Sequence, residues 1–159
     1  MMTQAKNGDA LSAYNVAVRY LTGDGVARNE REGFEWMSRA AYAGEPNAQF
    51  NLGVMYASGD RVPQSVTNAV KWYRLAAEKG MAEAQFNLAL ILYYGEGVRR
   101  DRDEAAKWFL QAAKRGMPGR SITLVIAAMW GLVSRKTAKR PSPGTANPPL
   151  RGWRKRKDA

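Results

Sequence analysis

The chain has 159 residues, 45% of them apolar, and contains neither cysteine nor histidine. That length is typical of one domain, and the two missing residue types exclude a disulfide framework, a thiol nucleophile, a zinc site of the usual ligands and an imidazole base. Of the net charge of +11, residues 1–133 hold only +3 (16 basic, 13 acidic), whereas residues 134–159 hold +8 (9 basic, 1 acidic). We therefore expect a near-neutral folded body with a basic tail, no enzymatic activity and no cofactor or metal.

The first nine residues lack the apolar segment of a signal peptide, and helical patterning follows at once. The longest apolar run, residues 122–130, is far shorter than the roughly 20 residues that a bilayer-spanning helix needs. We therefore expect residues 1–9 to be a lead-in to the first helix, no membrane span, and a cytoplasmic location.

A period of 36 residues runs through most of the chain without a gap. The asparagines Asn15, Asn51 and Asn87 are one period apart. The same offset relates three tryptophans, two sets of glycines and three alanine pairs, namely Trp36, Trp72 and Trp108; Gly23, Gly59 and Gly95; Gly44, Gly80 and Gly116; and Ala40–Ala41, Ala76–Ala77 and Ala112–Ala113. The sequence therefore predicts three repeats, residues 10–45, 46–81 and 82–117.

Each repeat is predicted to form two helices. The first ends at a glycine and spans roughly residues 10–22, 46–57 and 82–94. The second begins after a residue whose side chain caps helix N-termini, namely Asn29, Ser65 or Asp101. One hairpin cannot bury apolar residues on both helices, whereas stacked hairpins share a continuous core. We therefore predict an all-α fold, an α-solenoid of about three helix-turn-helix repeats with the tryptophans in its core, followed by a disordered C-terminal tail.

Specific residue runs accompany the period. The third repeat reads Ala82-Glu83-Ala84-Gln85-Phe86-Asn87-Leu88 and then Tyr94-Gly95-Glu96-Gly97-Val98. Over residues 10–117 the chain thereby resembles the Sel-1-like repeat, a relative of the tetratricopeptide repeat. The resemblance implies a curved, non-enzymatic bacterial scaffold that binds another protein or peptide. Some members carry a cysteine pair in each hairpin, and this chain has none, so the disulfide-bonded branch and its penicillin-binding activity are not expected.

The concave side of such an array, lined by the first helix of each hairpin, is the predicted binding surface for an unidentified protein or peptide. The repeated asparagines there have two interpretations. An asparagine inside a helix costs helix propensity unless its amide is used. Asn15, Asn51 and Asn87 therefore either hydrogen-bond a neighbouring loop or line the concave groove and clamp a bound peptide.

Variable residues mark the same predicted surface. One helical turn after the asparagines lie Arg19, Met55 and Ile91, which differ in chemistry while their neighbours repeat. Such variation is expected of a tailored binding surface and also of a solvated face. Tyr94, near the end of the first helix of the third repeat, either anchors a partner or covers an exposed end of the array.

The repeat pattern stops after Met117-Pro118. An apolar segment follows at residues 118–133, and residues 134–159 are basic and rich in proline, as in disordered extensions. The tail suggests an alternative function, binding of polyanions or nucleic acid, although no specific nucleic-acid recognition is expected. The exposed end of the third repeat also suggests weak self-association.

The tail also fits a fourth repeat that is translated out of frame. If the gene gained or lost a base near codons 118–120, each original codon consists of the third base of one present codon and the first two of the next. Read in this way, Trp130 followed by Gly131 must encode glycine, where Gly95 predicts one. Position 144 permits tryptophan, and positions 154–157 permit Ala-Glu-Ala-Gln, the sequence of residues 82–85. The hypothesis is that residues from about 119 onward are a frameshift product.

Overall fold

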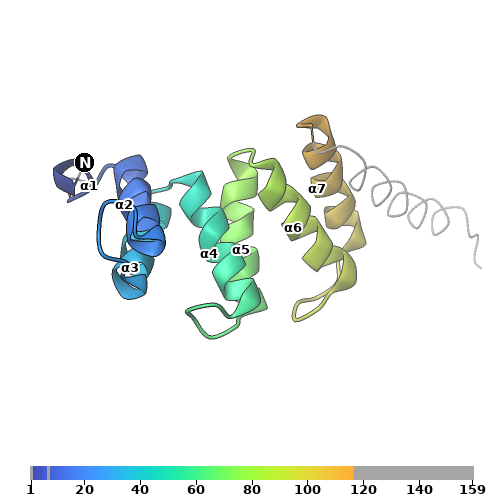
Figure 1. The fold of residues 1–159 in the computed structure, drawn as a ribbon. Helices are drawn as coiled ribbons and strands as arrows, with labels where there is room; N and C mark the ends of the chain where they lie inside the picture. Colours follow the sequence, from blue (N-terminus) through green and yellow to red (C-terminus); the bar gives the residue numbers. More distant parts are fainter. Residues whose placement is uncertain (1, 7, 117–159) are drawn as a thin grey trace, which may run out of the picture.

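A computed structural model describes residues 2–6 and 8–116, so the predictions for residues 117–159 lie outside the described part. The described residues form seven helices and no strand: α1 (Met2–Lys6), α2 (Ala10–Thr22), α3 (Glu30–Tyr42), α4 (Pro46–Ser58), α5 (Val66–Glu78), α6 (Ala82–Tyr94) and α7 (Arg102–Lys114). The hairpins α2–α3, α4–α5 and α6–α7 follow one another in a single row (Figure 1). The predicted all-α solenoid of three hairpins is therefore confirmed.

Local chemistry sets the helix boundaries. The side chains of Asn29, Ser65 and Asp101 accept hydrogen bonds from the backbone N–H three residues further on, at 3.2, 3.3 and 2.9 Å. The first helix of each hairpin ends at a glycine in the left-handed region; the N–H of Gly59, for example, donates to the Met55 carbonyl at 2.9 Å. These paired start and stop signals give all helices from α2 to α7 the same length of 13 residues.

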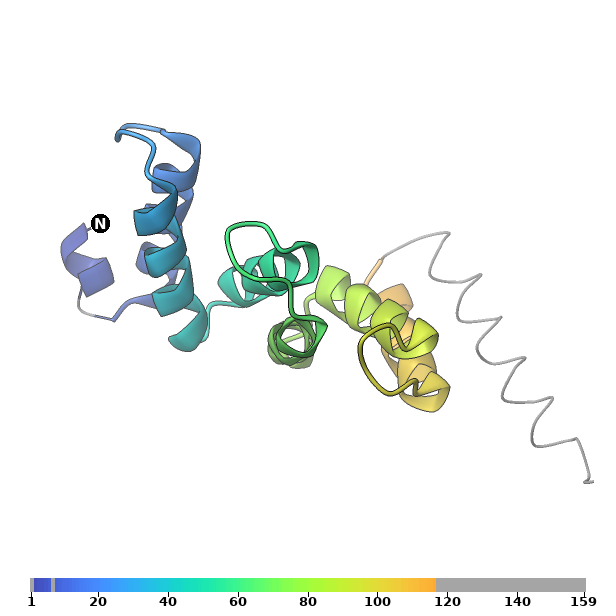
Figure 2. The same cartoon turned by 90° about the horizontal axis from the view of Figure 1, so that it is seen from below.

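The core consists of two clusters, and their division does not follow the repeats. The first joins α1, α2 and α3 to one side of α4, and the second joins α5, α6 and α7. Helix α4 contacts both, because Leu52 and Met55 belong to the first cluster while Phe50 and Tyr56 pack against the second. Figure 2 shows α4 between the first hairpin and the rest of the array. The central helix therefore connects the two halves of the hydrophobic core.

The three tryptophans are buried to different extents. Trp36 is buried in the first cluster, whereas Trp72 and Trp108 are half-buried. The ring of Tyr42 meets Trp72 edge-on, with centroids 5.1 Å apart, and the Trp108 indole N–H donates to Glu104 Oε1 at 3.1 Å. The expectation that all three lie within the core is therefore wrong for two of them, which pack at the edge of the core.

A buried glutamine connects each hairpin to the one before it. Gln49 Nε2 donates to the Ala41 carbonyl at 3.1 Å, and Gln85 Nε2 donates to the Ala77 carbonyl at 3.0 Å. Both glutamines are buried, and each donates to a carbonyl in the last turn of a helix, which also accepts the N–H of the glycine three residues later. We call the contact between hairpins one and two the first joint, and that between hairpins two and three the second joint.

A cation repeats at the joints as well. Lys79 donates to the Gly44 carbonyl across the first joint. At the second joint the Arg115 guanidinium lies over Gly80, where a Cβ atom would be 2.6 Å from Arg115 Cζ. Each joint therefore has one glutamine and one cationic side chain, and both approach the backbone of the preceding hairpin.

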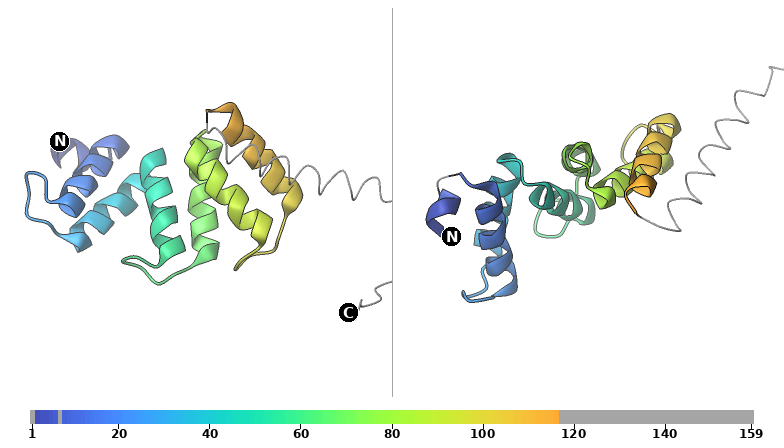
Figure 3. Two further views of the ribbon diagram at one scale, coloured as in Figure 1. Left: turned by 45° about the vertical axis from the view of Figure 1, so that its right-hand side comes forward. Right: turned by 90° about the horizontal axis from the view of Figure 1, so that it is seen from above.

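The lead-in has the form of the end of a second helix. The Gly8 N–H donates to the Ala5 carbonyl at 3.3 Å, as the Gly44 N–H donates to the Ala41 carbonyl at 3.0 Å one period later. Ala5 is buried against α2, and α1 lies beside that helix (Figure 3). Ala13 stands one period before Gln49, so α1 covers the first hairpin without a glutamine contact.

Candidate protein-binding surface

The first helices of the three hairpins expose equivalent positions. On α4, Phe50 and Asn51 are half-buried and Val54 is 39% exposed. The positions one period away are also half-buried: Tyr14, Asn15 and Val18 on α2, and Phe86, Asn87 and Leu90 on α6. We call the surface formed by these nine residues the A-helix face. Apart from the asparagines, it consists of apolar and aromatic side chains.

Two hollows open on this face. Groove one, about 270 Å³, lies between α2 and α4 and is lined by Val18, Leu21, Thr22, Met37, Asn51, Val54, Met55, Asp60 and Arg61. Groove two, about 290 Å³, lies between α4 and α6 and is lined by Ala57, Gln64, Val66, Leu90, Ile91, Tyr94 and Glu96.

The two grooves are related by the repeat. Leu21, Val54, Met55 and Asp60 of groove one are each 36 residues before a residue of groove two, namely Ala57, Leu90, Ile91 and Glu96. Stacked repeats place equivalent residues at a regular spacing along an array. One segment that crosses α4 can therefore insert apolar side chains into both grooves.

The grooves differ at their rims. At groove one, Arg61 pairs with Asp60 and lies 3.7 Å from Glu30 Oε1. One period later stand Gly97 and Val66, where a Cβ atom on Gly97 would be 2.9 Å from Val66 Cβ. Arg61 has a φ of 67°, a left-handed conformation that costs a non-glycine residue about 1–2 kcal/mol. The first rim thus has an ion pair and a strained residue, whereas the second has a glycine against a valine at the equivalent positions, with Gln64 and Glu96 as its polar lining residues.

A third hollow, about 550 Å³, lies at the start of α7. Its lining combines Leu92 with three arginines and three acidic residues, namely Arg99, Arg100, Arg102, Asp101, Asp103 and Glu104. The opposite charges offset one another, so this hollow does not form a basic patch. Among the described residues, no group of three or more acidic side chains is arranged to hold a metal ion, and no helix is long and apolar enough to span a membrane.

The sequence model of the Sel1 repeat matches residues 10–45, 46–81 and 82–117. The chain belongs to the Sel1 repeat family. Sel1 repeat proteins generally mediate protein–protein interactions, and their fold is generally a non-enzymatic scaffold. The resemblance seen in the sequence is therefore confirmed. A comparison with curated proteins finds no match.

Solved structures of Sel1 repeat proteins share the fold. A Sel1 repeat protein from Oxalobacter formigenes is 35% identical over 79% of this chain and 94% of its own, with a TM-score of 0.75. The protective antigen c5321 of uropathogenic Escherichia coli, which displays an SLR fold, is 36% identical over 72% of this chain and 25% of its own, with a TM-score of 0.67. Helicobacter pylori cysteine rich protein B, 20% identical over 76% of this chain and 94% of its own, with a TM-score of 0.60, supports the fold alone.

The asparagines of the Sel1 repeats contact neighbouring helices. Asn51 Nδ2 is 3.5 Å from the Tyr14 hydroxyl on α2, and Asn87 hydrogen-bonds the Tyr73 hydroxyl on α5. Burial raises the pKa of Tyr73, and the bond from Asn87 partly opposes that rise. Asn15, the equivalent residue of the first repeat, is half-buried on α2. Asn51 also lines groove one, so its structural contact does not remove it from the binding surface.

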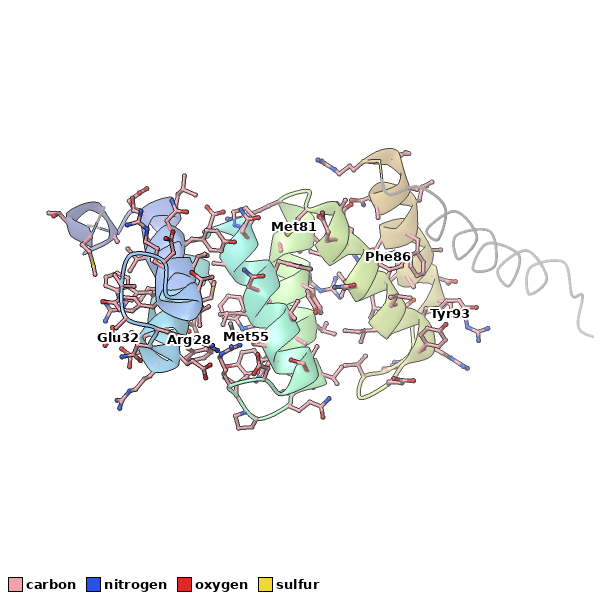
Figure 4. All side chains as sticks on the ribbon, in the orientation of Figure 1. Arg28, Glu32, Met55, Met81, Phe86 and Tyr93 are labelled. Atoms are coloured by element: carbon pink, nitrogen blue, oxygen red, sulfur yellow. The ribbon has the colours of Figure 1, made fainter. Side chains whose placement is uncertain are left out.

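The variable residues of the Sel1 repeats have three different surroundings. Met55 is only 6% exposed and forms the floor of groove one, and Figure 4 shows it between the first hairpin and α4. Ile91 is half-buried in groove two. Arg19 is exposed, but it lines a small cavity of about 60 Å³ with Met2 and Val26 instead of either groove.

Tyr94 lies at groove two with 58% of its surface exposed, and its ring packs edge-on against Tyr93, with centroids 5.2 Å apart. It is thus placed to meet a partner. The binding role of Tyr94, of the asparagines and of the variable residues stays a prediction.

Sequence reasoning missed the outward-facing apolar positions Val18, Val54 and Leu90. They lie three residues after the asparagines, and each lines or borders a groove. A signal was present, since an apolar residue recurs there in all three repeats. Helical periodicity alone assigns such a residue to the core, because a groove floor and a core have the same apolar composition.

Proposed function

We propose that this chain is a protein-binding scaffold whose A-helix face holds an extended or helical segment of another protein. The observation that carries the proposal is the repetition of an apolar groove at both joints, with Val54 in one and Leu90 in the equivalent place of the other. Apolar grooves with a few polar groups at the rim favour segments with regularly spaced apolar side chains. The general role of Sel1 repeats supports the same conclusion.

The rims add direction to the bound segment. Groove one has Arg61, Asp60 and Glu30 beside it, whereas groove two has the aromatic Tyr94 and Glu96. We expect the end of the segment near groove one to carry polar or charged side chains and the end near groove two to carry an apolar or aromatic one. This arrangement gives a single preferred orientation along the array.

A peptide-display selection against the immobilised full chain tests the proposal. Binding of the selected peptides is then measured by fluorescence anisotropy for the wild type, Val54→Asp and Leu90→Asp. Each aspartate places a charge in an apolar groove, so we expect affinity to fall at least about tenfold in both variants.

Leu75→Asp is the matched control. Leu75 is 42% exposed, close to the 39% of Val54, but lies on α5, outside the A-helix face. We expect this variant to bind as the wild type does. Peptides that bind all variants equally, or that lose affinity only with Leu75→Asp, would show that the A-helix face is not the site. Circular dichroism confirms that each variant is folded.

A further inference from the structure

The last described helix presents one half of a further joint. Ala113 and Gly116 are one period after Ala77, whose carbonyl accepts from Gln85 at the second joint, and Gly80, which lies under Arg115. A Cβ atom on Gly116 would meet no atom of the described residues within 4 Å, in contrast to Gly80. Leu110 of α7 is 43% exposed. We call this surface, formed by Leu110, Ala113 and Gly116, the α7 end surface.

The established joints define what fits the α7 end surface. A complementary hairpin needs a glutamine whose amide reaches the Ala113 carbonyl, as Gln49 and Gln85 reach the equivalent carbonyls. A second copy of this chain does not offer one, because Ala13 stands at that position of α2 and α1 already covers the helix. Position 121, one period after Gln85, is a serine in this chain. The required glutamine must therefore come from a different sequence.

The neighbouring reading frame permits that glutamine. Adding one base to the Gly119 codon allows glutamate at 119, alanine at 120 and glutamine at 121. The same frame then allows tyrosine, asparagine, leucine and glycine at positions 122–125. The resulting string, Pro-Glu-Ala-Gln-Tyr-Asn-Leu-Gly, has the pattern of Pro46-Asn47-Ala48-Gln49-Phe50-Asn51-Leu52-Gly53, and one nucleotide sequence satisfies all eight positions.

We infer that the α7 end surface is built to receive a fourth Sel1 hairpin, and that the gene encodes this hairpin in the neighbouring frame from codon 119 onward. The structure identifies the glutamine at the joint, and the genetic code permits a glutamine at the equivalent position, 121. The inference is independent of the ligand proposed for the A-helix face. It also accounts for the basic composition of residues 134–159 without a nucleic-acid partner.

The nucleotide sequence of codons 117–157 is the first test. We expect GGG for Gly119, CGC for Arg120 and AGT or AGC for Ser121, which together read Ala-Gln in the neighbouring frame. Any other codon for Arg120, or a TCN codon for Ser121, removes the glutamine and overturns the assignment of the fourth hairpin to this gene.

Restoring the frame is the second test. A gene with one base added in codon 119 is expressed beside the present one, and the midpoints of thermal unfolding are compared by circular dichroism. A stacked fourth repeat adds one joint, so we expect the midpoint to rise by roughly 5–10 °C. Replacing the new glutamine with alanine should lower the midpoint of thermal unfolding by roughly as much as Gln85→Ala lowers it in the same chain. An unchanged midpoint overturns the inference.

A third chain keeps the test decisive if the restored product does not fold. In it, codons 82–117 are duplicated after codon 117, so that a hairpin known to stack supplies the glutamine. We expect the same rise in midpoint, and its absence overturns the docking role of the α7 end surface. Sedimentation of the present chain tests whether a second copy occupies this surface. A concentration-dependent dimer that Leu110→Glu abolishes would assign the surface to a second copy instead.

Discussion

The two joints share one set of contacts and differ in another. In both, a buried glutamine and a cation meet the backbone of the preceding hairpin. The loop contacts differ, since Arg61 and Glu30 at the first joint are replaced by Gly97 and Val66 at the second. Contacts to backbone atoms are thus retained, because every residue offers the same acceptor, whereas contacts between side chains change from joint to joint.

The second helices differ in the same way. At the first joint the rings of Tyr42 and Trp72 pack edge-on. At the second, Arg74 pairs with Glu104, which also accepts the indole N–H of Trp108. The shared contacts define how hairpins stack, and the variable ones set how strongly each joint responds to pH, salt and mutation. The following predictions separate these two contributions.

The largest expected effect concerns equivalent core residues. Leu52 of the first cluster and Leu88 of the second are one period apart, and both are buried. We expect Leu52→Ala and Leu88→Ala each to lower the free energy of unfolding by about 2–5 kcal/mol, since each leaves a cavity. Urea unfolding followed by circular dichroism measures both. A single transition in each variant supports one cooperative array, whereas loss of only half the helical signal would show that the clusters unfold separately.

Removal of either joint glutamine should lower the free energy of unfolding by less than the leucine variants do, and by a similar amount at both joints. Gln49→Ala and Gln85→Ala each lose one buried hydrogen bond, which we expect to lower the free energy of unfolding by about 1–2 kcal/mol. The Oε1 atoms of both glutamines have no partner, and Gln85→Ala also loses a longer contact of 3.4 Å from Gln85 Nε2 to Gln111 Oε1. Unfolding energies that differ by more than about 1 kcal/mol would contradict the equivalence of the two joints.

Loop glycines should differ because only one approaches another hairpin. Gly25 has a φ of 71° and open space around it, whereas Gly97 has a φ of 74° and contacts Val66. Both Gly25→Ala and Gly97→Ala introduce left-handed strain of about 1–2 kcal/mol, and overpacking against Val66 should add about 1 kcal/mol to Gly97→Ala alone. Thermal unfolding of the pair measures the difference, and equal midpoints would contradict a contact at the second rim.

The smallest effect is a pH dependence at the second joint. The Arg74 guanidinium and, to a lesser extent, the Trp108 indole N–H lower the pKa of Glu104 from its usual 4.5. A lowered pKa in the folded state stabilises the fold fully above pH 4.5, and this contribution is lost as pH falls through the lower folded pKa. Because both side chains are partly exposed, we expect Glu104→Gln to cost at most about 1 kcal/mol at pH 7.

At pH 3 the wild type and Glu104→Gln should unfold at more similar temperatures than at pH 7. Glu30→Gln is the control, and it alters both the 3.7 Å ion pair with Arg61 at the first joint and the exposed 2.6 Å pair with Arg28. A difference between wild type and Glu104→Gln that does not change with pH would contradict the role of this carboxylate.

The fold was predictable because its signals are local. Capping residues such as Asn29 and glycines such as Gly59 act within one helical turn, so they mark helix ends without knowledge of the partners in space. Arg61 stands where the other two repeats have Gly25 and Gly97, and its φ of 67° is close to their 71° and 74°.

The binding surface was less predictable because it depends on stacking. Trp72 has the sequence context of the buried Trp36 and is nevertheless half-buried, since it lies at the edge between two hairpins. Met55 and Val54 are adjacent apolar residues, but one forms a groove floor and the other is 39% exposed. Only the rotation of one hairpin on the next decides between these positions.

Because the joints use backbone contacts, such proteins can gain repeats during evolution without changes elsewhere. A duplicate of residues 46–81 or 82–117 carries its own glutamine and cation, and the backbone that these side chains approach is present at the end of any hairpin of this type. A newly copied unit can therefore attach at once, before any of its other side chains have adapted to their neighbours. Lengthening by unequal exchange of gene segments requires no matching change elsewhere in the array.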